Sequence, residues 1–186
     1  MNTPLRLPPV SDAHRRALDV IRASITGELR TDDVHRLIYA TDASMYEVIP
    51  VGVVFPRSTD DVQAIVRAAA AAHLPLTPRT AGTSLAGQTV GPGLIVDVGR
   101  YMNRVLHIDP AARTVRVQPG VVRDDLNRAL APHKLLFGPD TSTTNRCMVG
   151  GMIGNNSCGS HSILYGTTRD HVASVDVVLA DGTLAT

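Results

Sequence analysis

Residues that could hold an anion gather in one stretch, residues 79–93, which reads R-T-A-G-T-S-L-A-G-Q-T-V-G-P-G. We call it the first glycine loop. Its four glycines alternate with small residues and hydroxyls, and it contains no aromatic side chain for a core. Glycine tolerates positive φ angles, so such a loop can turn backbone N–H groups outward into a concave site for a phosphate. A long surface turn is the alternative, because glycine is also common in turns.

Residues 138–166 form a second stretch of this kind, which we call the second glycine region. It holds six glycines and follows no sustained helical or strand period. Irregular connections of this length in a compact domain are usually functional or disordered. The pattern G-G-M-I-G-N-N at 150–156 adds backbone donors and amide side chains, which favours function. The two stretches together predict a site for an extended ligand with a phosphate in its middle.

The first glycine loop approaches a P-loop without matching it. Residues 82–89 read G-x-x-x-x-G-Q-T, and Gln88 stands where a P-loop has the lysine that reaches the terminal phosphates. The V-G-P-G that follows cannot open the helix that a P-loop requires. The sequence also lacks the G-x-G-x-x-G fingerprint of a Rossmann dinucleotide site. An NTPase is therefore not predicted.

The residues before the first glycine loop predict a β/α unit that presents it. A β-branched run at 51–55 precedes a helix at 62–73 capped by Ser58, and residues 74–76 add a second short strand. Ligands usually bind at the carboxyl ends of parallel strands, where this loop begins. After the loop we expect strands at 94–98, 105–108, 114–117, 135–137 and 172–179, and a helix at 121–130.

The residues before Val48 have a different texture. A helix that begins at Ser11 has one apolar stripe, and a second short helix is expected at 32–40. We therefore expect an N-terminal helical extension at 1–47 and one domain at 48–186. The turn at Asp181 and Gly182 has no complete partner strand before Thr186, so this domain is expected to be truncated.

Composition excludes several classes of function. The net charge is +1 and no basic cluster exceeds a pair, which argues against nucleic-acid binding. The longest apolar run, five alanines at 68–72, is far short of the roughly 20 residues of a membrane span. Cys147 and Cys158 fit neither a disulfide framework nor a zinc spacing, so we expect no metal site and a reducing cytoplasm.

Six motifs in order resemble the FAD-binding domain of the vanillyl-alcohol oxidase superfamily, the PCMH-type domain. They are R-T-A-G-T-S-L-A-G at 79–87, Y-M-N at 101–103, P-D-T-S at 139–142, G-G-M-I-G-N-N-S-C-G at 150–159, Y-G at 165–166 and V-V-L-A-D-G at 177–182. Within it, the chain is similar to FAD-linked D-2-hydroxyacid dehydrogenases of the D-lactate, glycolate and D-2-hydroxyglutarate type. The resemblance implies an α+β fold, with a small β/α subdomain followed by the start of a second, mainly antiparallel subdomain.

The resemblance implies that FAD is the ligand of both glycine-rich stretches. The first glycine loop would wrap the pyrophosphate, and the second glycine region would lie along the ribityl chain and the flavin. The implied cofactor-binding residues are Arg79, Thr80, Ala81, Gly82, Thr83, Ser84, Gly87, Gln88, Pro139, Asp140, Thr141, Gly150, Gly151, Asn155, Asn156, Gly159, Tyr165 and Gly166. Members with a covalent flavin often have histidine where Thr83 stands, so non-covalent FAD is expected.

For the parent protein, the resemblance implies hydride transfer from a small D-2-hydroxyacid to FAD, with an electron acceptor as second partner. The motif N-N-S-C-G-S-H-S-I resembles long bacterial members, so an iron–sulfur cluster is expected in a C-terminal domain. Catalytic and metal-binding residues are expected beyond Thr186. A cytoplasmic enzyme, peripheral to the inner membrane through its acceptor, is implied. A same-fold enzyme with another substrate and a fragment without activity are the alternatives.

Three residues of the second glycine region have chemistry of their own. His161 could act as a base, but we interpret it as an exposed loop histidine because no acid is near in sequence. Asp140 is interpreted as a turn-capping residue after Pro139, and Cys158 as a small packing residue. Many family members have arginine where Leu164 stands, which removes one polar contact.

Overall fold

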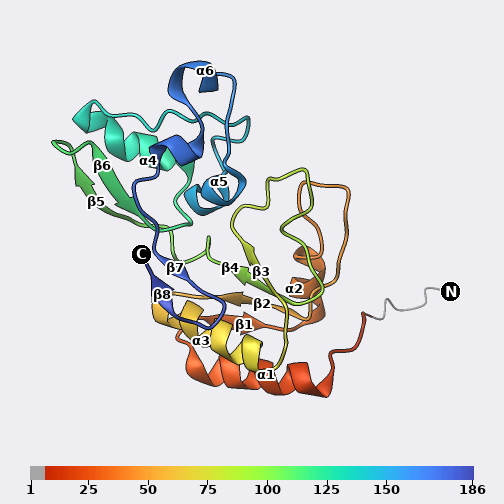
Figure 1. Cartoon of the computed structure of the whole chain (residues 1–186). Coiled ribbons are helices and arrows are strands. Elements are labelled where there is room, and N and C mark those ends of the chain that lie inside the picture. The colour runs from red at the N-terminus through yellow and green to blue at the C-terminus, as the bar shows by residue number, and fades with distance from the viewer. Residues whose placement is uncertain (1–6) are drawn as a thin grey trace. The chain divides into compact units, whose positions relative to one another are not determined.

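The computed structural model describes residues 7–186, so the first six residues of the predicted extension lie outside it. The chain divides into two compact units, which are described separately (Figure 1). The first unit contains the described residues up to Pro78, together with Ser84–Val96 and Val178–Ala185. The second contains Arg79–Thr83 and Asp97–Val177, with Thr186. The mixture of helices and strands confirms the predicted α+β class.

The first unit is built on a sheet with the strand order β1-β2-β4-β3. The strands are β1 (Glu28–Arg30), β2 (Gly52–Phe55), β3 (Leu76–Arg79) and β4 (Leu94–Asp97). β2 and β4 are parallel and every residue of both is buried, as expected of strands covered on two faces. β1 pairs with β2 in antiparallel register, Leu29 opposite Val54, and was not predicted. Its three residues are too few to show an alternating pattern.

Helices α1 (Asp12–Ser24) and α3 (Thr59–Ala71) lie together on one side of this sheet (Figure 1). The predicted caps are confirmed, because Ser11 accepts a hydrogen bond from the His14 N–H and Ser58 accepts one from the Asp61 N–H. α3 begins three residues before the predicted start, directly after its cap. The second predicted helix is α2 (Asp33–Ile38).

β4 lies between β2 and β3, which the sequence order does not reveal. The Leu94 and Val98 N–H groups donate to the Pro75 and Arg79 carbonyls at 2.9 and 3.0 Å. The partners advance in the same direction, so β3 and β4 are parallel neighbours. Parallel neighbours need a crossover connection of about a dozen residues or more. The first glycine loop is that crossover.

The second unit packs a hairpin against helices. Val121, Leu126, Leu130 and Val149 form its buried core, with Phe137 partly buried against them. Its elements are β5 (Val105–Asp109), β6 (Thr114–Val117), α4 (Arg123–Leu130), η1 (Ala131–His133), α5 (Val149–Asn155), α6 (Ser162–Tyr165) and η2 (Thr168–His171). β5 and β6 are antiparallel, as the mainly antiparallel subdomain requires.

Two sequence predictions were wrong and a third was only partly right. The second glycine region is partly helical, because burial of Val149 and Met152 in α5 overrides the low helix propensity of its glycines. Residues 135–137 form no strand. The strand expected at 172–179 is reduced to β7 (Val177–Val178), which pairs with β8 (Leu184–Ala185). The turn between them is confirmed, since the Gly182 N–H donates to the Leu179 carbonyl at 2.9 Å.

Candidate functional site

The first glycine loop turns at Gly82, a buried residue with a φ of +64° that L side chains rarely adopt. No hydrogen bond within residues 7–186 uses the backbone N–H groups of Ala81, Gly82 or Thr83. A buried residue whose N–H has no acceptor is unusual in a folded chain. Three successive free donors beside a positive-φ glycine are suited to an anionic ligand, which would supply the acceptors.

The later part of the loop, which belongs to the first unit, is held by the segment before β2. Thr89 donates from Oγ1 to Oδ2 of Asp42 at 2.8 Å, and Ser84 donates to Oε1 of Gln88 at 2.6 Å. Burial raises the pKa of Asp42, but hydrogen bonds from Ser44 and Thr89 outweigh burial and leave that pKa below its usual value. The loop therefore has a fixed anchor outside its own sequence.

Gly87 completes this anchor. It has a φ of +77°, and a Cβ on it would lie 2.4 Å from the ring of Tyr46. A side chain at position 87 would therefore displace the tyrosine as well as strain the backbone.

Two of the predicted stretches meet within the second unit, where Thr80 lies against helix α5. A Cβ on Gly151 would lie 2.5 Å from Oγ1 of Thr80, and a Cβ on Gly150 would lie 2.6 Å from Cβ of Pro119. The Gly150 N–H donates to the Pro119 carbonyl at 2.8 Å. The two glycines thus permit close packing of α5, and the Gly150 amide is already in use by the protein.

Asp140 connects the two ends of the second glycine region. Its carboxylate accepts hydrogen bonds from the His161 N–H at 3.2 Å and from Ser160 Oγ at 3.3 Å, and it contacts Nδ1 of His161. The His161 side chain is the main cause of a lowered Asp140 pKa. The interpretation of Asp140 as a turn cap was therefore wrong. His161 is exposed as expected, at 66 %, but its acid partner lies 21 residues away in sequence.

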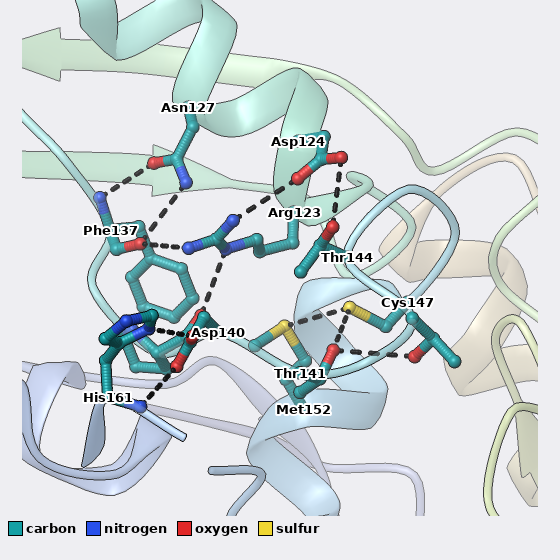
Figure 2. A network of polar contacts seen from close by, with 12 residues as sticks. Arg123, Asp124, Asn127, Phe137, Asp140, Thr141, Thr144, Cys147, Met152 and His161 are labelled. Carbon is teal, nitrogen blue, oxygen red and sulfur yellow. Dashed lines mark hydrogen bonds and ion pairs between the residues drawn. The ribbon is translucent and has the colours of Figure 1, made fainter. Parts of the chain in front are cut away.

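Helix α4 supplies two side chains that the sequence analysis missed and that hold the backbone of residues 137–139 (Figure 2). Arg123 donates from Nε to the Pro139 carbonyl at 3.0 Å and from Nη2 to the Phe137 carbonyl at 3.4 Å. Asn127 accepts the Phe137 N–H at 2.8 Å and donates to its carbonyl at 3.3 Å. Positions four apart share one face of a helix, so a polar pair beside the core stripe of α4 was the available signal.

The two cysteines have different surroundings. Cys147 is buried, and its Sγ lies 3.1 Å from Oγ1 of Thr141 and 3.6 Å from Sδ of Met152 (Figure 2). Cys158 is exposed, so the interpretation of that residue as a packing residue was wrong. Thr141 and α5 are thereby joined through a buried thiol.

Other predicted site residues serve the local fold of the second unit. Asn156, with a φ of +47°, ends α5, and its side chain accepts the Arg169 N–H at 2.9 Å. The Gly159 N–H donates to Ser162 Oγ at 2.9 Å, and the Gly166 N–H donates to the Ser162 carbonyl at 2.8 Å. Tyr165 packs against Gly138, because a Cβ added to Gly138 would lie 2.8 Å from the Cβ of Tyr165. Their assignment to a cofactor stays a prediction.

Two general properties of the described residues bear on the type of site. Within residues 7–186, no group of three or more His, Cys, Asp or Glu side chains is arranged to hold a metal ion. No helix in that range is long and apolar enough to cross a membrane. What the described residues do provide is a run of unused backbone donors among side chains no larger than threonine at positions 80–84.

An α+β fold whose glycine-rich crossover offers backbone donors to an anion defines a domain that binds a phosphate-containing cofactor. The chain belongs to the FAD binding domain family, which matches residues 50–186. The residues present fit this cofactor, because the free N–H groups at 81–83 and the small side chains around them suit a pyrophosphate. The predicted family is thereby confirmed.

Individual proteins resemble the chain over most of its length. D-2-hydroxyglutarate dehydrogenase of Escherichia coli K12 is 46 % identical over 160 residues, which are 84 % of this chain and 16 % of that protein. Glycolate oxidase subunit GlcD of Bacillus subtilis is 38 % identical over 162 residues, 85 % of this chain and 34 % of that protein. The chain therefore spans a minor part of the length of both relatives.

A solved structure, alkyldihydroxyacetonephosphate synthase, superposes with a TM-score of 0.82. It is 23 % identical, and the match covers 100 % of this chain and 36 % of that one. Likeness at this identity concerns the fold, and it confirms the PCMH-type FAD-binding fold that the motifs predicted.

Proposed function

We propose that this chain is the FAD-binding part of a flavin-dependent D-2-hydroxyacid dehydrogenase. The observation that carries the proposal is the free N–H run at Ala81, Gly82 and Thr83 in a member of the FAD binding domain family. The substrate class, a lactate-, glycolate- or 2-hydroxyglutarate-type acid, is supported by relatives named D-2-hydroxyglutarate dehydrogenase and glycolate oxidase subunit. Oxidation of that acid is proposed for the whole protein. This chain matches only 16 % of the length of the first relative and 34 % of the length of the second.

The first glycine loop binds the pyrophosphate in this proposal. The three free N–H groups donate to phosphate oxygens, and hydrogen bonds to a charged acceptor are the stronger kind. Gly82 holds the turn that aims them, and Thr80 against Gly151 keeps the start of the loop on α5. Ser84, Gly87 and Gln88 continue the loop on the anchor that Asp42 and Tyr46 provide.

The second glycine region orients the rest of the cofactor. Pro139, Asp140 and Thr141 lie along the ribityl chain and flavin in this assignment, where backbone and hydroxyl groups satisfy its oxygens. FAD, when bound, accepts the hydride that leaves the substrate. Because a threonine stands at position 83, where covalent members often have histidine, no bond to the flavin forms by this route, which supports non-covalent binding in this proposal.

The path of the electrons after FAD is also part of the proposal. The motif at 155–163 supports transfer through an iron–sulfur cluster in a C-terminal domain to a separate acceptor. An enzyme that passes electrons to a membrane acceptor would be cytoplasmic and peripheral to the inner membrane.

Expression of the full-length parent protein, beside the chain of residues 1–186, tests the proposal. We expect flavin absorption in the purified full-length protein and release of all flavin on denaturation and filtration. We also expect bleaching of the flavin by achiral glycolate or by one chiral D-2-hydroxyacid and not by its L-enantiomer. A full-length protein that contains no flavin and takes up none would contradict FAD binding. Flavin that stays with the denatured polypeptide would contradict only the non-covalent assignment.

A further inference from the structure

We infer that Arg123 is a positioning residue of the proposed FAD site, because it fixes the conformation of residues 137–147. That segment carries Pro139, Asp140 and Thr141, which are predicted to contact the cofactor. The inference rests on the proposed function for what the segment binds. The contacts that hold the segment are independent of that function.

The guanidinium of Arg123 joins three groups from a position where its side chain is only 14 % exposed. Nε donates to the Pro139 carbonyl, Nη2 to the Phe137 carbonyl and Nη1 to Oδ1 of Asp124, at 3.0, 3.4 and 3.3 Å. A planar guanidinium can span two carbonyls of one backbone segment, whereas the ammonium of lysine acts as a single point. The backbone at 137–139 therefore depends on the shape of this side chain as well as its charge.

The first turn of α4 also holds the far end of the segment. The backbone N–H groups of Arg123 and Asp124 donate to the Cys147 and Thr144 carbonyls at 3.0 and 3.2 Å. Oγ1 of Thr144 donates to Oδ2 of Asp124 at 3.1 Å. Both ends of residues 137–147 are thus attached to one helical turn (Figure 2).

The predicted cofactor contacts lie between these attachments. Asp140 reaches across to His161, and Thr141 contacts the buried thiol of Cys147, which in turn contacts Met152 of α5. A shift of the Pro139 carbonyl would therefore move the two residues that follow it and loosen the packing around Cys147. Nε, Nη1 and Nη2 of Arg123 each donate one hydrogen bond within the protein, which uses three of the five N–H donors of the guanidinium. These contacts hold the segment, so the role inferred for Arg123 acts through the segment.

The chain has its own reporter for this segment. Cys147 is 5 % exposed and Cys158 is exposed, so a thiol reagent such as DTNB should react quickly with one cysteine and slowly with the other. In Arg123→Gln we expect the slow reaction to accelerate about tenfold while the fast reaction is unchanged, the effect of losing about one charge-assisted hydrogen bond. The rate of the slow reaction in Arg123→Lys should fall between those of Arg123→Gln and the wild type, because lysine restores one of the two carbonyl contacts.

Arg128→Gln is the matched control. Arg128 is on the same helix, is 76 % exposed, and pairs only with the exposed Asp125 among the residues described. It should leave both thiol reactions unchanged. If Arg123→Gln fails to fold, as judged by circular dichroism, Asn127→Ala replaces it, because that change releases only Phe137.

The same variants in the full-length protein test the connection to FAD. We expect Arg123→Gln to raise the Kd for FAD about tenfold and to shift the visible absorption band of the bound flavin, with no change in Arg128→Gln. An unaltered Cys147 reaction would overturn the inference. So would a faster Cys147 reaction with unaltered FAD affinity and spectrum, and the proposed function would then stand. A wild-type protein that binds no FAD would overturn both.

Discussion

Replacement of Gly82 by valine is the sharpest test of the first glycine loop. The residue has a φ of +64°, and the left-handed conformation costs an L side chain about 1–2 kcal/mol. A Cβ there would also lie 2.8 Å from Nη2 of Arg79, although the end of that flexible side chain can move. We therefore expect the backbone at position 82 to rotate toward negative φ in Gly82→Val, which changes the directions of the neighbouring N–H groups.

The loss of FAD affinity follows from the number of donors that move. A hydrogen bond to a charged group contributes about 1.5–3 kcal/mol, so losing two donors to the pyrophosphate costs about 3 kcal/mol or more. That corresponds to a Kd raised roughly a hundredfold. Titration of apoprotein with FAD, followed by the quenching of flavin fluorescence, measures this directly in the full-length protein.

His161→Ala is the control for that titration, because the His161 side chain is largely exposed and interacts with Asp140 rather than with the first glycine loop. We expect its Kd to rise far less than that of Gly82→Val, because the change removes only an exposed partner of Asp140 and leaves the first glycine loop intact. If Gly82→Val and His161→Ala weaken FAD binding equally, the role assigned to the loop is wrong. A Gly82→Val protein that binds FAD normally would refute the strain argument as well.

Two further predictions concern stability. A Cβ on Gly154 of α5 meets nothing within 4 Å, so Gly154→Ala should raise the unfolding free energy by up to about 1 kcal/mol in chemical denaturation. A Cβ on Gly159 would lie 1.3 Å from the Asp140 carbonyl oxygen, so Gly159→Ala should lower the unfolding free energy strongly. The opposite ranking of the two variants would contradict the packing described. Hydrogen bonds from the Thr167 N–H and side chain lower the pKa of Asp170, so Asp170→Asn should be less stable than the wild type at neutral pH. This difference in stability should vanish as the pH falls through the folded-state pKa of Asp170, which lies below the usual value of about 4. A difference that grows in acid would show that another interaction is responsible.

Local signals in the sequence located most elements of the fold. Ser11 and Ser58 mark helix starts because their side chains satisfy first-turn N–H groups, and the strand at 114–117 was predicted to the residue. Elements that depend on distant partners were not predictable in this way. β1 forms because it pairs with β2, and α5 forms because Val149 and Met152 are buried.

The candidate site likewise has parts that local sequence patterns predicted and parts that depend on contacts between distant residues. The motifs identified both glycine-rich stretches, but they did not say which glycines serve the fold. Gly151 and Gly159 permit close approach of Thr80 and of the Asp140 carbonyl, contacts that no local pattern encodes. Arg123 belongs to no motif, and its carbonyl partners lie 14 and 16 residues away, so only the folded chain reveals it.

The parallel pairing of β3 and β4 has a consequence for how this loop can change. A hairpin turn can be shortened or extended while its strands stay paired, but a crossover has a minimum span fixed by the sheet it serves. The minimum length of residues 80–93 is therefore a property of the scaffold, whereas their identities are available for recognition. A descendant that lost its cofactor would still need a connection of about a dozen residues or more, and a redesign for another anion can alter or add residues on the loop but cannot shorten it below that span.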